Sequence, residues 1–358
     1  MHVLVTGHLG YLGTVLVPVL LDAGHSVVGL DSDLYAGCTF TDGIADVPQL
    51  RLDVRDVGAD QLAGFDAVVH LAALSNDPLG DLDPQLTDAI NGIGSVRLAE
   101  LAKTAGVARF VFFSSCSNYG AAGDGLVDEQ AELHPLTPYA VSKVYVEREV
   151  STLADETFTP VFLRNATAYG VSPRLRCDLV LNDLVGWAFT TGRVLLRSDG
   201  TAWRPIVHAE DIARACAAAL AAPADVVRAQ AFNVGSTDQN YRIRELAEIV
   251  AETVPGARVE YAEGAAPDKR SYRVDFAKIG RALPDFVARW NARSGARELY
   301  DAYQRTGLTR EDFEGSRYRR VDRIRSLSSS GELDSSLRRR NRVADAEDVS
   351  THARARSR

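Results

Sequence analysis

Cysteine, tryptophan and methionine are scarce in this chain of 358 residues. It has three Trp, one Met and four Cys, and the cysteines at positions 38, 116, 177 and 216 form no Cys-x-x-Cys pair. Scattered thiols exclude a disulfide-rich fold and a zinc site of paired cysteines, and they favour reduced thiols in a cytosolic protein. The pattern His-Glu-x-x-His is also missing, so we expect no metal site.

Long apolar runs and an excess of basic charge are missing as well. No apolar segment is long enough to span a bilayer, and the first residues lack the basic start and small-residue cleavage site of a secretory signal. With 40 basic and 48 acidic residues, the formal net charge is −8, which argues against a dedicated nucleic-acid-binding protein. We therefore expect a cytoplasmic protein with neither a membrane nor a nucleic acid as partner.

The sequence does contain alternating strand-like and helix-like segments through its first half. Apolar, strand-like runs lie at residues 2–6, 27–30, 50–54, 67–72 and 109–114, and helical stretches lie at 11–23 and 85–105. Continuous apolar strands separated by helices are typical of a parallel sheet that is covered on both faces. We predict an α/β fold of the Rossmann type, a doubly wound parallel sheet with a smaller, interleaved substrate-binding lobe.

The domain boundaries follow from where this alternation loosens. We assign residues 1–164, with return segments near 206–235, to the sheet domain, and residues 165–205 and 236–325 to the smaller lobe. Residues 326–358 are rich in Ser, Arg, Asp and Glu and are predicted to be a largely flexible tail, in which Leu333 and Leu337 still have the option of local packing. The basic cluster at 338–340 fits a solvated tail better than a nucleic-acid contact, because acidic residues follow it.

A glycine-rich turn joins the first predicted strand to the first helix. It reads Gly7-His8-Leu9-Gly10-Tyr11-Leu12-Gly13. Glycines in this position allow a tight turn and let the backbone approach a pyrophosphate, which the N-terminus of the helix then attracts. Asp31 ends the second strand 24 residues after Gly7, close to the spacing expected for a carboxylate that binds the cofactor ribose. Because that carboxylate repels a 2′-phosphate, NAD is favoured over NADP.

Three further residues suggest chemistry on such a cofactor. Tyr139 and Lys143 are four residues apart at the start of a predicted helix, so both side chains can point into one site. A free phenol has a pKa of about 10, and a neighbouring ammonium lowers that value toward the range of a useful base. Ser115 follows the strand at 109–114 and can hold the substrate oxygen that Tyr139 deprotonates. Each signal is weak alone, but the three together, in this order, predict a catalytic site.

With these motifs the chain resembles the extended short-chain dehydrogenase/reductase family, in its branch of nucleotide-sugar epimerases and dehydratases. The matching segments are Gly7-x-x-Gly10-x-x-Gly13, Tyr139-x-x-x-Lys143, His70-Leu71-Ala72-Ala73 and the run from Trp203 to Asp211. The resemblance implies that Asp53 and Val54 flank the adenine and that Leu71, Ala72 and Ala73 line the cofactor. It further implies a nucleotide-diphosphate sugar as substrate, with Arg204 and Arg270 binding its diphosphate, and a homodimer.

The resemblance leaves the reaction open between several outcomes of one common oxidation step. Dehydratases of this branch carry an Asp-Glu pair, and decarboxylases a Glu, where this chain has Cys116 and Ser117. A 4-epimerase needs neither carboxylate, so it is the favoured hypothesis. A keto-sugar reductase, a dehydratase and a non-catalytic dinucleotide sensor are the alternatives. Cys116 is expected to be a packed thiol, although a thiol that faced the sugar would serve as an acid or base.

The substrate contacts depart from the pattern of the branch. Thr167 stands where many relatives have an Asn, so contacts to the sugar or the nicotinamide are expected to differ there. We consider Ser117, Thr167 and Asn182 candidate substrate contacts, with a structural cap or turn as an equally good interpretation of Asn182. Residues 294–324 are expected to form a packed helical hairpin, although a subdomain over the substrate cleft or an oligomer contact would also fit.

Overall fold

The computed structural model describes residues 1–340 except for 124, 267 and 269. Its centre is a parallel sheet of seven strands in the order β11-β7-β5-β4-β1-β2-β3. The strands are β1 (His2–Thr6), β2 (Ser26–Leu30), β3 (Gln49–Leu50), β4 (Ala67–His70), β5 (Arg109–Ser115), β7 (Thr159–Asn165) and β11 (Gln230–Val234). The order reverses between β1 and β4, and in such sheets ligands bind at this switch point, outside the carboxyl ends of the strands. The predicted fold class is thus confirmed.

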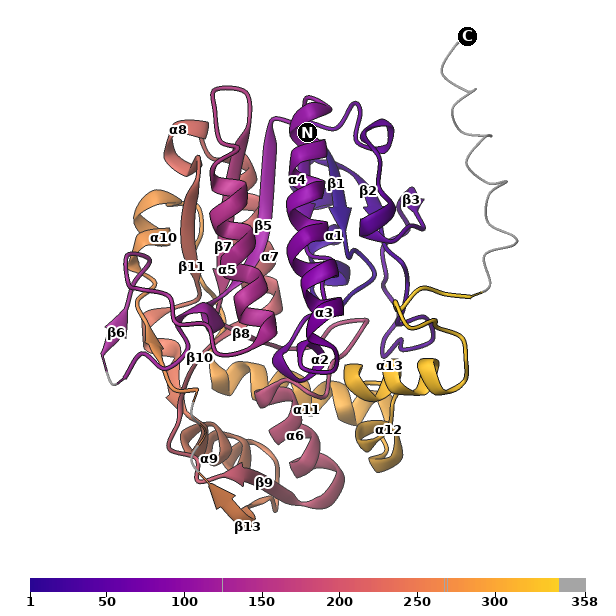
Figure 1. The fold of residues 1–358 in the computed structure, drawn as a ribbon. Helices are drawn as coiled ribbons and strands as arrows, with labels where there is room; N and C mark the ends of the chain where they lie inside the picture. The colour runs from indigo at the N-terminus through magenta and orange to yellow at the C-terminus, as the bar shows by residue number, and fades with distance from the viewer. Residues whose placement is uncertain (124, 267, 269, 341–358) are drawn as a thin grey trace.

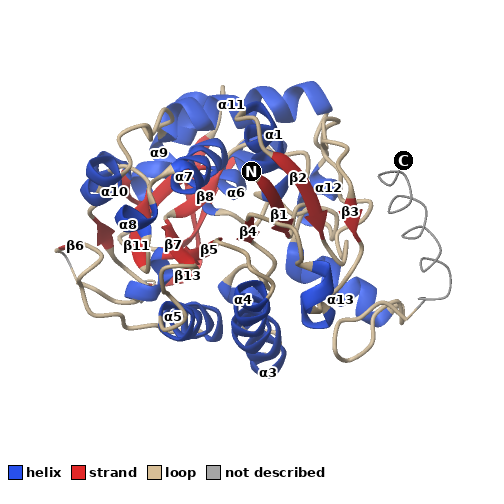
Figure 2. Ribbon diagram, turned by 90° about the horizontal axis from the view of Figure 1, so that it is seen from above, coloured by secondary structure: helices blue, strands red, loops and turns tan. Residues whose placement is uncertain are grey.

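Helices cover both faces of the sheet, which produces three layers (Figure 2). The helices α1 (Gly13–Asp22) and α7 (Ala209–Ala221) lie on one face, and α4 (Gly94–Thr104) and α5 (Pro138–Ser151) lie on the other. Side chains alternate along β1, so that Val3 and Val5 join the core beneath α1 while Leu4 joins the core beneath α4. A strand that is buried on both faces must be apolar throughout, which explains the continuous run Val3-Leu4-Val5.

The helical stretch predicted at 85–105 is divided in the structure. It consists of α3 (Pro84–Thr87), a π-helical turn (Asp88–Ile93) and α4. Within the turn, the Asn91 side chain is fully buried and bonds to both backbone polar groups of Leu74, accepting from N–H at 2.8 Å and donating to C=O at 3.0 Å. These bonds fix the loop after β4, which also carries α2 (Asp77–Gly80).

The smaller lobe lies below the carboxyl ends of the strands in the view of Figure 1. Its helices are α6 (Val180–Thr191), α9 (Ile243–Thr253), α11 (Ala292–Thr306) and α12 (Arg310–Glu314). Its strands are β9 (Arg193–Ser198) with β13 (Arg258–Ala266), and β8 (Thr167–Tyr169), β10 (Trp203–His208) and β12 (Asn240–Arg242) in a three-stranded sheet. Short elements complete the fold, namely α8 (Ala224–Val227), α10 (Ala277–Ala282), β6 (Leu126–Val127) and β14 (Arg273–Val274).

The C-terminal segment differs from the prediction of a flexible tail that begins at residue 326. Helix α13 (Arg320–Ser329) and the residues after it pack against the sheet domain, where Leu327, Leu333 and Leu337 are buried in the core that also contains Leu79. The prediction is wrong for residues 326–340 because three spaced leucines are enough to seat a segment that is otherwise polar. The remaining residues of the predicted tail, 341–358, lie outside the described part of the chain.

Candidate active site

A cavity of about 940 Å³ lies between the two lobes, at the carboxyl ends of β1, β2, β4 and β5. Its size suits a large ligand, since binding pockets usually measure roughly 300–1,000 Å³. Of the candidate residues, the cavity is lined by Gly7, Gly10, Tyr11, Leu12, Gly13, Asp31, Asp53, Val54, Leu71, Ala72, Ala73, Ser115, Ser117, Tyr139, Lys143, Thr167, Arg204 and Arg270. Residues that are distant in the sequence are therefore brought to one site.

Positions 7 and 13 of the glycine-rich turn have no room for a side chain. Gly7 has a φ of +74°, and a Cβ on it would lie 2.8 Å from the Ala72 nitrogen. A Cβ on Gly13 would lie 2.3 Å from the Gly7 carbonyl oxygen and 2.6 Å from the His8 Cα. The first helix thus begins directly against the turn, with its free N–H groups at the cavity. Such a cradle fits the diphosphate of a dinucleotide.

The Asp31 carboxylate is held in place at the end of β2. It accepts the Leu9 N–H at 3.0 Å and the Asp33 N–H at 2.8 Å, and burial raises its pKa. An oriented acceptor beside the glycine turn fits the ribose hydroxyls of NAD. Asp53 also lines the cavity, but its carboxylate is bound to Arg55, with contacts of 2.8 and 2.6 Å. The hydrogen-bond donors and acceptors in this part of the cavity therefore match NAD, the cofactor that the sequence predicts.

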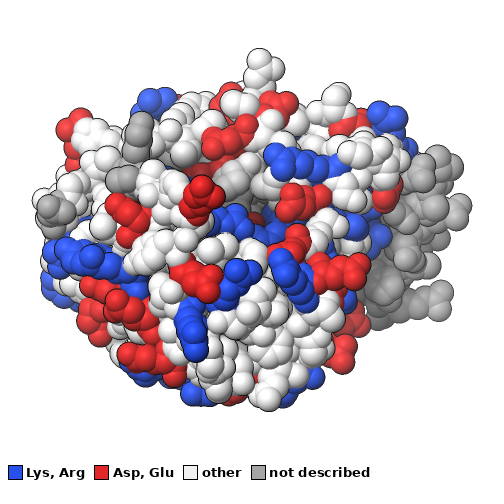
Figure 3. Space-filling model, turned by 90° about the horizontal axis from the view of Figure 1, so that it is seen from below, with Lys and Arg blue, Asp and Glu red and all other residues white. Residues whose placement is uncertain are grey.

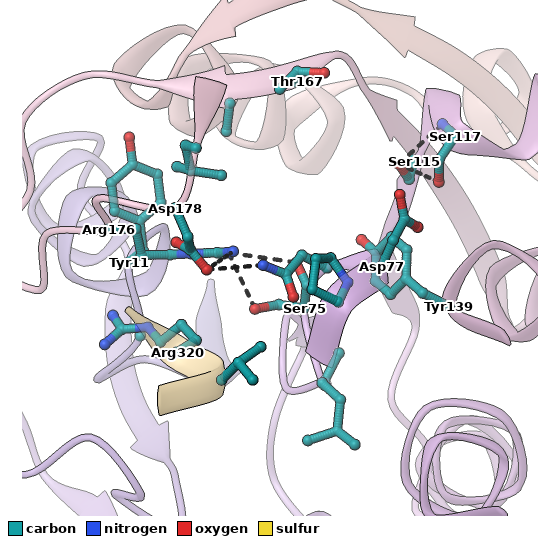
Figure 4. A pocket seen from close by; sticks show the side chains of 18 of the residues that line it. Tyr11, Ser75, Asp77, Ser115, Ser117, Tyr139, Thr167, Arg176, Asp178 and Arg320 are labelled. Carbon is teal, nitrogen blue, oxygen red and sulfur yellow. Dashed lines mark hydrogen bonds and ion pairs between the residues drawn. The ribbon is translucent and has the colours of Figure 1, made fainter. Parts of the chain in front are cut away.

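Ser115, Tyr139 and Lys143 lie together at the carboxyl end of β5. Thr137 caps α5 by accepting the Ala140 N–H at 3.2 Å, which starts the helix just before Tyr139. One turn further, the Lys143 Nζ donates to the Phe113 carbonyl at 2.8 Å and lies 5.6 Å from the centre of the Tyr139 ring. Figure 4 shows Tyr139 beside Ser115, facing the cavity. The phenol, the hydroxyl and the ammonium thus share one end of the cavity.

Neighbouring charges shift the pKa values of Tyr139 and Lys143 in opposing directions. Burial, with a contribution from the Asp77 carboxylate, raises the pKa of Tyr139 to about 12, although Arg176 and a hydrogen bond with Ser115 act in the opposite direction. Burial lowers the pKa of Lys143 to about 7, against the influence of Glu147. In the protein alone, Tyr139 is therefore a neutral phenol at neutral pH, and Lys143 carries only part of a charge. A further cation near the ring is needed to produce the phenolate.

A buried network under the loop fixes Ser115 and its neighbours. Glu147 of α5 accepts Ser114 Oγ–H at 2.5 Å and pairs with Arg164 at 2.7 Å. Ser117 donates its hydroxyl to Ser115 Oγ at 2.9 Å and lines the cavity. The Cys116 thiol, in contrast, is fully buried in the core and donates to the Arg164 carbonyl at 3.1 Å. Cys116 is a packed thiol, as expected, and not a group that faces the cavity.

Two arginines and two aspartates line the cavity where the smaller lobe meets α2 of the sheet domain. Arg204 Nη2 lies 2.8 Å from Asp268, and Arg270 pairs both with Asp268 at 2.9 Å and with Asp77 at 2.7 Å. Asp77 comes from the sheet domain, whereas Arg270 comes from the smaller lobe, so this pair joins the two. The arginines predicted to bind a diphosphate are thus present but occupied by carboxylates. An entering diphosphate would have to replace them.

The structure contradicts Asn182 as a substrate contact. Its side chain is fully buried, accepts the Gly170 N–H at 3.0 Å and donates to the Arg176 carbonyl at 2.9 Å. It fixes the loop before α6 and is not among the residues that line the cavity. Asn182 therefore has the structural role in a turn that the sequence allowed as the alternative. Its amide satisfies backbone groups that would otherwise be buried without hydrogen-bond partners. Thr167, in β8, does line the cavity and is only partly buried.

Several residues that line the cavity were not singled out from the sequence. They are Asp77, Arg176, Asp178, Asp268 and Arg320. Arg176 is fully paired, with Nε 2.9 Å from Asp178 and Nη1 donating to Ser75 Oγ at 3.2 Å. Figure 4 shows Tyr11, Arg176, Asp178 and Arg320 on one side of the cavity, opposite Tyr139 and Asp77. No short motif marks these residues, because they meet only through tertiary packing.

Three further observations concern one face of the molecule and the described residues. On the face seen in Figure 3, basic and acidic side chains are interspersed, so that face has no continuous basic surface. Among the described residues, no group of three or more His, Cys, Asp or Glu is placed to hold a metal ion. No helix in the same part of the chain is both long enough and apolar enough to cross a membrane.

Comparison with known proteins identifies the family. A sequence model described as the NAD dependent epimerase/dehydratase family matches residues 3–235. A dTDP-glucose 4,6-dehydratase of Streptomyces griseus is 31% identical over 300 residues, covering 79% of this chain and 88% of that protein. A UDP-glucose 4-epimerase of Mycolicibacterium smegmatis is 32% identical over 269 residues, covering 71% of this chain and 83% of that protein.

Solved structures agree with this result. MoeE5 in complex with UDP-glucose and NAD has a TM-score of 0.74 and 29% identity, covering 86% of this chain and 100% of that chain. The family, the enzyme class and the NAD cofactor that the sequence predicts are confirmed. The chain belongs to the NAD dependent epimerase/dehydratase family: it is an NAD-dependent enzyme of the extended short-chain dehydrogenase/reductase type, in the branch that acts on nucleotide sugars.

Proposed function

We propose that the protein is a nucleotide-sugar 4-epimerase that oxidises its substrate transiently to a keto-sugar. The observation that carries the proposal is the composition of the catalytic end of the cavity. Ser115, Tyr139 and Lys143 meet there, while the next two positions hold a thiol turned into the core and the small hydroxyl of Ser117. These groups suffice for reversible oxidation of a carbinol, and the two positions provide no carboxylate for loss of water or of carbon dioxide.

Each residue has a defined task in this reaction. The Tyr139 phenolate accepts the proton of the sugar 4-hydroxyl, and Ser115 donates a hydrogen bond to the same oxygen. The Lys143 ammonium, fixed by the Phe113 carbonyl, favours the phenolate electrostatically. NAD held by the glycine turn and Asp31 would supply the acceptor and later the donor of the hydride, and the positive charge of its oxidised ring would favour the phenolate. Return of the proton from Tyr139 completes the inverted alcohol.

The smaller lobe is proposed to hold the nucleotide diphosphate. Arg204 is almost completely buried, and its guanidinium lines the cavity beside Arg270. A guanidinium is a geometric match for a diphosphate, because it offers two parallel N–H donors. With its diphosphate held there, the sugar has freedom to turn between the two hydride transfers. The similar MoeE5 structure contains UDP-glucose and NAD together, which supports a cavity that accommodates both a nucleotide sugar and the cofactor.

A second candidate is the dehydratase reaction, and one observation favours it. Asp77 is a carboxylate that lines the cavity close enough to raise the pKa of Tyr139. Elimination of water needs an acid and a base in addition to the tyrosine. Asp77 already accepts the Thr137 hydroxyl at 2.7 Å and pairs with Arg270, so it is less free than a dedicated acid/base. We therefore rank the dehydratase second.

The test is to incubate the protein with UDP-, dTDP-, GDP- and CDP-sugars and to identify products by NMR. We expect one sugar to give a product of unchanged mass with one inverted carbon and no net formation of NADH. A product that has lost water would establish the dehydratase, and stoichiometric use of NADH would establish a reductase. Binding of NAD without turnover of any sugar would leave the non-catalytic dinucleotide sensor as the remaining hypothesis.

We also propose a homodimer formed by α4 and α5, which lie side by side on the outer face of the sheet domain (Figure 1). Two apolar side chains support this proposal, since Ile93, which precedes α4, is 54% exposed and Val141 of α5 is 51% exposed. Sedimentation of the purified protein checks it: twice the mass of one chain is expected, and the mass of a single chain would contradict it.

A further inference from the structure

The C-terminal helix α13 brings a buried arginine to the wall of the cavity. Arg320 is 2% exposed, and it lines the cavity together with Val321, Asp322 and Arg325 of the same helix. Helix α13 lies well beyond residue 235, where the match to the family model ends. The glycine turn, Asp31 and Tyr139 all lie within that match. The contribution of α13 to the cavity wall therefore comes from outside the segment that carries the family motifs.

Arg320 lacks the partners that a buried cation needs. Its Nη2 donates to the Arg174 carbonyl at 2.9 Å, and its guanidinium carbon lies 4.0 Å from the centre of the Tyr35 ring. Its Nη1 has no hydrogen-bond partner, and no carboxylate of the described residues forms an ion pair with it. An unpaired charge in such a place destabilises the folded protein. Because Arg320 lines the cavity, an anion bound there would supply the negative charge that this guanidinium lacks.

The neighbouring arginines show that this need is specific to Arg320. Arg176 is neutralised by Asp178 at 2.9 Å, and Arg174 has Asp33 at 3.4 Å. Arg176 and Arg320 are close enough for each to disfavour the charge of the other, since the Arg176 charge lowers the pKa of Arg320 in addition to burial. Of these three arginines, Arg320 alone has no carboxylate within ion-pair distance among the described residues.

The segment is seated firmly enough to act as a wall. Ile324 and Leu327 are buried against the sheet domain. Beyond the helix, Ser336 accepts Arg55 Nη2–H at 2.8 Å through its carbonyl, and Arg339 Nη2 donates to the Asp33 carbonyl at 2.7 Å. These contacts fall on the loops after β2 and β3, next to the two aspartates assigned to the adenosine half of NAD. Helix α13 thus covers the cofactor side of the cavity.

We propose that Arg320 binds the diphosphate of NAD, so that the C-terminal segment is part of the dinucleotide site. The diphosphate is the anionic group of the cofactor, and the helix N-terminus at the glycine turn binds it from one side only. Arg320 shares its side of the cavity with Tyr11 of that turn (Figure 4). Arg204 and Arg270, in contrast, lie with Asp268 and serve the substrate. The stacked Tyr35 ring orients the guanidinium before the ligand arrives.

The experiment measures binding to the protein freed of cofactor, by calorimetry and thermal unfolding, for the parent and for Arg320→Met. We expect Arg320→Met to weaken binding of NAD and ADP-ribose by roughly 10- to 100-fold, because one hydrogen-bonded charge pair is lost. Adenosine, which has no phosphate, should bind both proteins equally. Inorganic pyrophosphate should raise the unfolding temperature of the parent more than that of the variant, which keeps the glycine turn and the other arginines.

Two further variants make the result decisive. Arg320→Gln is a second neutral replacement that keeps a donor for the Arg174 carbonyl, and it should repeat the loss if the Met variant does not fold. Arg310→Ala removes an exposed arginine of α12 that pairs with Glu314 at 3.2 Å, and it should bind NAD like the parent. An arginine with a purely structural role would lower the unfolding temperature of the ligand-free variant instead, with NAD affinity intact.

Three outcomes would overturn the proposal. The first is NAD affinity within twofold of the parent in a folded neutral variant. The second is an equal loss of affinity for adenosine and ADP-ribose, which would assign Arg320 to packing of the adenosine half. The third is a loss of affinity for UDP-glucose alone, measured as a separate arm, which would assign the guanidinium to the substrate diphosphate.

Discussion

The two ends of the cavity are built in opposite ways. At the catalytic end, Lys143 is fixed by a backbone carbonyl and Ser115 by a neighbouring serine, so the reacting groups have no charged partner to exchange. At the substrate end, Arg204 and Arg270 are held by the carboxylates of Asp268 and Asp77. The side chains of the first end are in position before a ligand arrives, although the phenolate still requires the charge of the cofactor. At the second end, ion pairs must be replaced when the ligand binds.

This difference separates chemistry from binding. A rigid catalytic end places the phenol for proton transfer without reorganisation, which is where most of the rate enhancement is expected to arise. While the site is free, the ion pairs at the substrate end neutralise the charges of the two arginines and fix their orientation. The same carboxylates then compete with the diphosphate for the guanidinium groups. Changes at the catalytic end should therefore act on turnover, and changes at the substrate end on affinity.

The largest effect is expected from Tyr139→Phe. Loss of the phenolic proton acceptor should lower kcat by roughly 100- to 10,000-fold, while NAD affinity stays close to that of the parent. Discontinuous assays with the substrate identified by NMR measure kcat, and calorimetry measures the affinity for NAD. Tyr145→Phe, on the same helix and stacked with Arg148 at 5.5 Å, is the matched control. Turnover in Tyr139→Phe equal to that of the control would contradict the assignment.

Arg204→Met should act on the other end and with a smaller effect. We expect KM for the nucleotide sugar to rise by roughly 100-fold, because a buried charge contact with a diphosphate is lost, while kcat falls much less. NAD affinity should not change. Steady-state kinetics with the same substrate separate the two constants. A fall in kcat with KM unchanged would show that the two ends are not divided as proposed.

Lys143→Met tests the burial of the ammonium through stability. Because the folded pKa of Lys143 is about 7 and its ordinary value is 10.5, the unfolded chain holds an extra proton between these values. The stability of the parent should therefore rise as the pH increases from 7 to 9, by about 1–2 kcal/mol, and the variant should lack this rise. Urea unfolding of the cofactor-free proteins measures it. A difference between the two proteins that does not change with pH would contradict the lowered pKa.

The smallest effect is expected from Asp77→Asn, which touches both ends. Removal of this carboxylate takes away one of the causes that raise the pKa of Tyr139, so the rising limb of the pH profile of kcat/KM should move to lower pH, by about one unit or less. KM should fall by a few fold because Arg270 loses a competing partner. Asp81→Asn, just after α2, is the control. A limb that moves to higher pH would contradict the electrostatic argument.

The catalytic end could be read from the sequence because its parts are local. Tyr139 and Lys143 share one helix face, and the glycine turn follows one strand directly. Gly13 is required by the backbone of the same β-α unit, and Gly7 by the loop after the adjacent strand. Continuous apolar strands likewise specified a parallel sheet. Such features depend on periodicity and short spacing, which a single sequence displays.

The substrate end and the C-terminal wall could not be read in the same way. Asp77 and Arg270 are 193 positions apart, and Arg320 meets Tyr35 only after α13 docks on the sheet domain. Asn182 has the composition of a binding residue, yet its amide is used by the backbone of Gly170 and Arg176. Leu327, Leu333 and Leu337 fix a segment whose overall composition resembles a solvated tail. Long-range packing decided each of these cases.

The most direct test of the proposed reaction follows a deuterium atom. The nucleotide sugar accepted by the protein would carry deuterium on carbon 4, and the product would be analysed by NMR. The account predicts that deuterium remains on carbon 4, now with inverted configuration and with no loss of water. Deuterium found on another carbon, or washed out into solvent, would contradict a hydride that leaves and returns at one position beside Tyr139.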